Sequence, residues 1–278
     1  FGSSHKFGSE SASKSLAMMG AVDGEIIGSV APEQVEMAMG PHLACLAKQS
    51  KIEVREKARA LEALTALMGA EIEMANKYQI FAEGGHQEIF YAAEKTGCCT
   101  RQLKQLCPDC APWNLEILHR SDDGGYAKAF HMERPCSYTC CCLNRPKVEV
   151  RDVLNGGSKV GSIQDPFACC DLTFTLRGPE DQEVLKAKGG CCQWGLCCPL
   201  PCGLCSVVEF KIEDMQGKEV GNLKKKVPGC CKFFFASDVD NYQIDFGSIQ
   251  EPKWKALLMG LSLFIDFRYF NDNKADNE

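Results

Sequence analysis

Apolar and polar residues alternate along most of the chain after about residue 76. Every second side chain is apolar in four segments, 78–80, 172–176, 208–212 and 242–246. Because successive side chains of a β-strand point to opposite faces, this period of two predicts strands with one buried face. Shorter runs at 148–150 and 160–163 predict further strands.

Turn sequences separate these strands. Paired or flanked glycines occur at 83–85, 122–125, 155–157 and 216–218, and such pairs are typical of hairpin turns. The chain shows no alternation of strands with helices, which argues against a doubly wound nucleotide-binding fold. The pattern predicts an antiparallel sheet system that is either closed into a barrel or folded into a sandwich.

The first quarter of the chain has a different texture. Residues 1–30 are rich in glycine and serine and predict a flexible tail. Residues 31–75 are rich in Ala, Glu, Lys, Leu and Met, and the apolar positions at Leu61, Leu64 and Leu67 recur at helical spacing. We therefore expect a helical segment over 31–75, followed by the β domain over 76–278.

The stretch 253–270 predicts a second helix. Its centre is apolar on every face except at Ser262, so it belongs in a protein core or in lipid. Ten residues span only about 15 Å, and Asp266 would be costly inside a bilayer. A closed antiparallel barrel around this helix satisfies both limits; insertion as a single membrane pass is the alternative. The side chains expected in the core or membrane are Ala256, Leu257, Leu258, Met259, Leu261, Leu263, Phe264 and Ile265.

Composition narrows the function classes. Of the 278 residues, 45% are hydrophobic and 24% are charged, as in globular proteins, and the net charge of −6 argues against general nucleic-acid binding. The sequence contains no nucleophile elbow, phosphate-binding glycine loop or paired-histidine metal motif, so no catalytic residue is assigned.

The 19 cysteines are the most unusual feature, and many of them are adjacent in sequence. Three chemistries fit them besides ordinary buried thiols: disulfides, zinc binding and S-acylation. The two C-x2-C units at 107–110 and 202–205 have the ligand spacing of a zinc site. The segments 137–143 and 190–202 place cysteines among apolar neighbours, which suits acylation.

Two charged segments are candidate binding sites. Asp238 and Asp240 stand at the first and third positions of a calcium-type loop, but Ile249 occupies position twelve, which excludes an EF-hand. A weaker site with Asp245 or Glu251, or a simple polar turn, fits the residues. The run Lys224, Lys225 and Lys226 fits contact with anionic lipid, a nuclear-import peptide or a solvated strand end.

From about residue 61 to residue 270 the chain resembles the phospholipid scramblases, a family with a tubby-like β-barrel around a C-terminal helix. The segment 263–267 in register with the acidic segment is the most specific part of the likeness. The residues that carry the resemblance are NKYQI (76–80), CCTR (98–101), RPCS (134–137), CCL (141–143), GP (178–179), VG (220–221), DVDNY (238–242), KWKALLMG (253–260) and LFIDF (263–267).

The resemblance implies calcium-dependent, energy-independent movement of phospholipids between bilayer leaflets, which is translocation and not covalent catalysis. It also implies a cytoplasmic position at the plasma membrane, anchored by palmitate on Cys141 and Cys142, with Cys136 and Cys140 nearby. The calcium ligands it implies map onto Asp238, Asp240, Tyr242, Ile244, Phe246 and Glu251. Here the sequence departs from the family, since Ile249 and Gly247 replace the family's acid and proline.

The expected partners are phospholipids, the membrane and a second copy of the chain. Calcium is the expected cofactor, and zinc is the alternative. Scrambling requires a polar path through the bilayer, which one short helix does not offer. A palmitoyl-tethered lipid-binding or signalling adaptor is therefore the second functional hypothesis.

Overall fold

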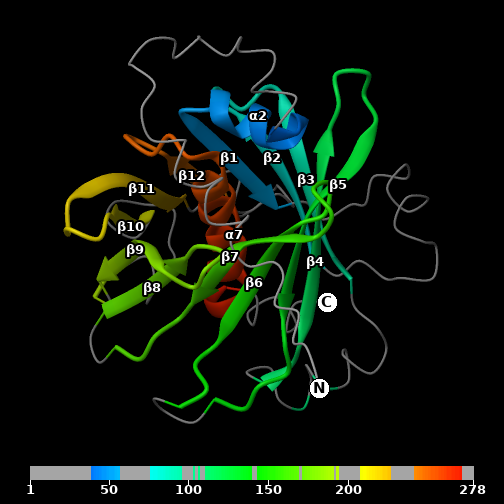
Figure 1. The fold of residues 1–278 in the computed structure, drawn as a ribbon. Helices are drawn as coiled ribbons and strands as arrows, with labels where there is room; N and C mark the ends of the chain where they lie inside the picture. The colour runs from blue at the N-terminus through cyan, green and yellow to red at the C-terminus, as the bar shows by residue number, and fades with distance from the viewer. Residues whose placement is uncertain are drawn as a thin grey trace, which may run out of the picture. The chain divides into compact units, whose positions relative to one another are not determined.

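The computed structural model describes residues 39–56, 76–95, 103, 106, 110–139, 143–168, 171–190, 192–193, 207–226 and 241–270. In this part of the chain, twelve antiparallel strands close into one barrel, in which every strand pairs with its neighbours in sequence (Figure 1). The strands are β1 (Lys51–Glu56), β2 (Lys77–Ala82), β3 (Glu88–Lys95), β4 (Trp113–Arg120), β5 (Tyr126–Arg134), β6 (Lys147–Asp152), β7 (Ser158–Gln164), β8 (Asp171–Arg177), β9 (Glu183–Gly190), β10 (Val207–Glu213), β11 (Glu219–Lys226) and β12 (Asn241–Asp245).

The pairing of β1 with β12 closes the ring. Ile52 lies opposite Ile244 and Val54 lies opposite Tyr242, so the four side chains share the inner face. The predicted closed antiparallel barrel is confirmed. The prediction of helix throughout 31–75 is wrong at Lys51–Glu56, where a period of two is present but short, between two stretches of helix-forming composition. Residues 57–75, including Leu61, Leu64 and Leu67, lie outside the described residues.

Helix α7 (Pro252–Tyr269) fills the barrel (Figure 1). The predicted core side chains of this helix, from Ala256 to Ile265, are at most 1% exposed. The helix needs no polar face because strands surround it, which explains why its sequence is apolar all round. It lies close to β7 at Gly161, where a Cβ would clash with the carbonyl of Arg177 and lie 3.0 Å from Leu257. The expectation of a helix inside a strand-built enclosure is confirmed.

A short helix, α2 (Pro41–Lys48), lies against the N-terminal part of α7. The buried ammonium of Lys255 donates hydrogen bonds to the carbonyl oxygens of Ala47 at 3.0 Å and of Gln49 at 2.7 Å. A cation is favourable there because the last carbonyls of a helix have no partner within the helix. Lys255 thus joins α2 to α7.

Because the strand order follows the chain, connections alternate between the two ends of the barrel. At one end, which we name the turn end, five-residue turns join the strands at 83–87, 121–125, 153–157, 178–182 and 214–218. Gly124 and Gly217 have positive φ there, as tight turns require. At the other end, the connection end, the strands are joined by 57–76, 96–112, 135–146, 165–170, 191–206 and 227–240. Helix α2 lies at the turn end, and α7 finishes at the connection end.

Candidate functional site

The order of the strands determines which end of the barrel each cysteine-containing segment joins. Cys45 is in α2 at the turn end, and every other cysteine falls in a connection of the connection end. Among the described cysteines, Cys136 carries an exposed free thiol, and Cys110 is 9% exposed and disulfide-bonded. Burial raises the pKa of the Cys45 thiol, so that cysteine is less reactive. Sequence segments that are far apart therefore contribute cysteines to connections of the same end.

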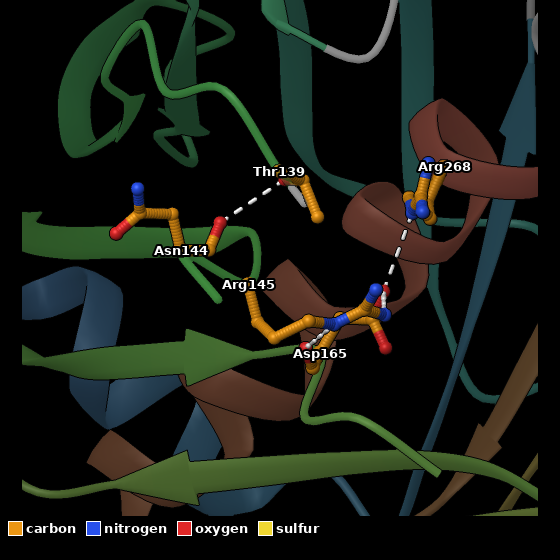
Figure 2. Close-up of polar contacts among 5 residues, drawn as sticks. All are labelled: Thr139, Asn144, Arg145, Asp165 and Arg268. Atoms are coloured by element: carbon orange, nitrogen blue, oxygen red, sulfur yellow. Dashed lines mark hydrogen bonds and ion pairs between the residues drawn. The ribbon is translucent and has the colours of Figure 1, made fainter. Parts of the chain in front are cut away.

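The connection 135–146 is tied at two points. The Thr139 hydroxyl donates a hydrogen bond of 3.0 Å to the carbonyl oxygen of Asn144 (Figure 2). The backbone amide of Ser137 donates one of 3.3 Å to the carbonyl oxygen of Cys110. Cys140, Cys141 and Cys142 lie outside the described residues, but they are covalently confined between Thr139 and Leu143. Their acylation stays a prediction, as does that of the exposed Cys136.

Three segments meet at Asp165. The Arg145 guanidinium lies 2.7 Å from the Asp165 carboxylate and also donates to its carbonyl oxygen at 3.1 Å. Arg268, near the end of α7, lies 3.3 Å from the same carboxylate (Figure 2). Asp165 is 3% exposed, whereas the side chains of Arg145 and Arg268 are 17% and 21% exposed, so the carboxylate is shielded from water and the two cations are only partly shielded. Burial, with the Asp165 charge as the next cause, raises the pKa of Tyr269 to about 12. The cluster fixes two connections to the helix.

The carboxylate of Asp266 is the centre of a second cluster of polar side chains. Asp266 is fully buried and accepts hydrogen bonds from the hydroxyls of Tyr78 at 2.6 Å and Tyr242 at 2.7 Å. The ammonium of Lys225 lies 3.5 Å from it and 3.3 Å from the centre of the Phe270 ring. Burial, reinforced by the Asp266 charge, raises the pKa of Tyr78 well above its ordinary value. A buried charge is tolerated when it is paired and hydrogen-bonded, as this one is.

The three consecutive lysines Lys224, Lys225 and Lys226 do not share one face of β11. Lys225 points into the barrel and is 3% exposed, whereas Lys224 lies on the outer face, 3.1 Å from Glu209, and Lys226 is exposed. The alternation of a strand separates neighbouring side chains. The run therefore does not form a single basic patch, and lipid contact through Lys224 and Lys226 stays a prediction.

The residues proposed to bind calcium are spread along the barrel. The side chains of Tyr242, Ile244 and Phe246 are at most 1% exposed in the core, and Glu251 is exposed at the turn end, just before α7. Asp238 and Asp240 lie outside the described residues. Across the residues that the structure describes, no group of three potential metal-ligating side chains comes together. Neither calcium nor zinc binding is tested by this, and both stay predictions.

Sequence reasoning missed the partners in these clusters. It noted Asp266 as a charge in an apolar helix, and that isolation was the available signal of a buried partner. It assigned no role to Arg145, Asp165 or Arg268, whose exposed-looking charges carry no such signal.

Comparison with known proteins decides the family. The sequence profile of the Scramblase family matches residues 29–272. The chain belongs to the scramblase family. It is 30% identical to phospholipid scramblase 2 of Bos taurus, over 78% of this chain and 68% of the relative. It is 31% identical to phospholipid scramblase 1 of Mus musculus, over 83% of this chain and 64% of the relative. It is 29% identical to phospholipid scramblase 1 of Homo sapiens, over 86% of this chain and 68% of the relative.

No solved structure shows significant similarity to this scramblase-family chain. Within the described residues, none of the helices combines the length and the apolar character needed to traverse a bilayer.

Proposed function

We propose that this chain is a membrane-associated scramblase that moves phospholipids in both directions between bilayer leaflets without ATP. Family membership supports the reaction class. The observation that supports the proposal for this chain is the exposed thiol of Cys136 in the connection 135–146, whose sequence also contains Cys140, Cys141 and Cys142. Such a cluster would allow several lipid chains to attach to one connection.

Acylation of this end would provide the membrane anchor. Two or more acyl chains give stable attachment, whereas one gives only marginal binding. Cys136, whose thiol is exposed, and the trio Cys140, Cys141 and Cys142 are the proposed acceptors. The hydrogen bond between Thr139 and Asn144 brings together the two sides of the segment that contains the trio. We place the anchored protein at the cytoplasmic face of the plasma membrane.

The packed barrel limits how lipid can move. Helix α7 fills the interior with side chains such as Leu258, Met259 and Phe264, all fully buried, so a headgroup has no route along the barrel axis. A headgroup needs a polar path across about 30 Å of hydrocarbon. We therefore propose that the path lies outside the barrel, between copies of the chain gathered by their lipid anchors.

Calcium is proposed as the activator through the segment that contains Asp238 and Asp240. Carboxylate oxygens are suitable calcium ligands, and this segment belongs to the connection end. Asp238 and Asp240 would hold the ion, and its positive charge would attract anionic headgroups.

The same packed interior favours a second candidate function. A barrel with a filled core and an acylated end also suits a tethered adaptor that binds lipid headgroups and does not transport them. The two functions differ in one measurable property, the transfer of lipid between leaflets.

The test is reconstitution of the purified full chain in vesicles that contain fluorescently labelled phospholipid. Dithionite quenches only the outer leaflet, so scrambling extends the loss of signal beyond one half. We expect this extension with calcium, and a smaller one in the variant Asp238→Asn with Asp240→Asn. Quenching that stops at one half with and without calcium would contradict scrambling and favour the adaptor. Equal activity with and without calcium would remove calcium alone from the proposal.

A further inference from the structure

Exposed apolar side chains are concentrated at the connection end. Among the described residues, the four most exposed large apolar side chains are Leu106 at 84%, Tyr138 at 70%, Leu143 at 65% and Phe167 at 49%. All four lie in connections of that end. Exposed large apolar side chains placed together mark an interaction surface.

Three of these side chains lie in connections that the contacts described above tie at neighbouring residues. Tyr138 and Leu143 flank the segment closed by Thr139 and Asn144, and Phe167 follows Asp165 by two residues. The pairing of Arg145 with Asp165 joins the two connections, and the backbone amide of Asp165 donates to the carbonyl oxygen of Pro146 at 3.0 Å. Their presentation is thus built into the fold, as Figure 2 shows for the residues that tie it.

We propose that Tyr138, Leu143 and Phe167 insert into the interfacial layer of a lipid bilayer and orient the barrel with its connection end toward the membrane. The inference rests on the proposed function, because the cysteines proposed for acylation lie between Tyr138 and Leu143 in sequence. A thiol flanked by inserting side chains is held at the depth where a membrane-bound acyl donor is found.

The chemistry of the three side chains favours a bilayer over a protein partner. Tyrosine places its ring among apolar groups and its hydroxyl among polar headgroups, which suits a membrane interface. The three side chains project from two connections and are few, whereas a specific protein interface buries about 800 Å² on each partner. The described exposed apolar side chains of the turn end are Val153 at 37%, Leu154 at 41% and Met215 at 47%, so they are less exposed than the three proposed anchors, and none of them is aromatic.

The test uses the full chain produced without acylation and sedimentation with vesicles of phosphatidylcholine and phosphatidylserine. The variant Tyr138→Ser, Leu143→Ser, Phe167→Ser removes the proposed anchors. The matched control Val153→Ser, Leu154→Ser, Met215→Ser removes as many apolar side chains from the turn end. Both sets are exposed, so both variants should unfold at the urea concentration of the parent. We expect the first variant to bind vesicles at least thirtyfold more weakly, since each lost side chain weakens binding several-fold, and the control to bind within twofold of the parent.

Four results would overturn the inference. The first two are equal losses of vesicle binding in the two variants and a larger loss in the control. The third is that the unmodified parent does not bind vesicles. The fourth is that the first variant changes only self-association, which would mean that these side chains contact a second copy of the chain and not lipid. The dithionite assay separates this inference from the proposed function. If the parent scrambles lipid and the first variant binds vesicles as well as the parent does, only the insertion is rejected. If the first variant binds more weakly than the control, as expected, but the parent does not scramble lipid, only the proposed function is rejected.

Discussion

The two ends of the barrel are built differently from the same strands. The turn end has five-residue turns and is covered by α2, which is joined to α7 through Lys255. The connection end has longer connections, whose sequences contain every cysteine except Cys45, and among the described residues it presents the most exposed large apolar side chains. The difference indicates that the turn end covers the core, and it fits our proposal that the connection end contacts a lipid bilayer.

Helix α7 is held by a different interaction at each end. Toward the turn end, a lysine donates to backbone carbonyls, and toward the connection end, buried aspartate accepts from tyrosines on two strands. These contacts add directional polar interactions at the two ends of the helix to the apolar packing between them.

The largest expected effect is at Asp266. Replacement by asparagine (Asp266→Asn) removes the carboxylate and leaves the buried Lys225 ammonium without its 3.5 Å partner, at a cost of about 3–5 kcal/mol in the free energy of unfolding. Urea denaturation measures this loss. Adding Lys225→Met should recover part of it, because the uncompensated charge is then gone. A loss below about 1 kcal/mol would show that the polar anchor at the connection end contributes little.

A smaller effect is expected at the opposite anchor. Lys255→Met keeps the length of the side chain but leaves the carbonyls of Ala47 and Gln49 without their donor, at a cost of about 2 kcal/mol. Hydrogen exchange of the α2 amides should accelerate more than exchange in β4. Equal acceleration in the two elements would mean that Lys255 supports the whole barrel and not the turn end in particular.

Acid should loosen the turn end. Burial, and next the nearby charge of His42, lower the pKa of His119, while Asp122 raises it. The unfolded chain therefore binds more protons near this pKa, so the contribution of His119 to stability is complete above about pH 6.5 and is lost as the pH falls.

The variant His119→Gln removes this proton uptake. Between pH 7 and pH 5, its urea midpoint should fall less than that of the parent, while all other titrating groups are shared. Equal falls in parent and variant would locate the acid sensitivity elsewhere in the barrel.

The smallest effect is expected on the outer face of the barrel. Lys224→Gln removes only a half-exposed ion pair with Glu209 and should change the free energy of unfolding by less than about 0.5 kcal/mol. Lys225→Gln, one residue along, should cost several times more because its side chain lies inside. Similar values in urea denaturation would contradict the alternation that separates these neighbours.

Much of the fold was predictable because its signals are local. Alternation predicted six of the twelve strands, β2, β6, β7, β8, β10 and β12, and glycine-containing sequences predicted four of the five tight turns. An all-apolar stretch predicted the enclosed helix. The strands that were not predicted include β3, which does not alternate because seven of its eight residues are buried. β1 escaped because six residues of alternation lie beside helix-forming composition. Of the candidate site, only the acylation segment and the charged runs could be found, since a pattern in one segment does not reveal its partners.

The sequence by itself determined that the chain forms antiparallel strands and an apolar C-terminal helix, because a period of two and an unbroken apolar run are local signals. The strand pattern left a barrel and a sandwich open, and only the tertiary structure closed the ring around the helix. Only the tertiary structure decided which groups meet. Tyr78 and Asp266 are 188 residues apart, and Lys225 and Asp266 are 41 apart, yet closure of the ring brings all three together. It also decided that the connections whose sequences contain these cysteines join strands at the same end of the barrel, because antiparallel strands in chain order send every second connection to the same side.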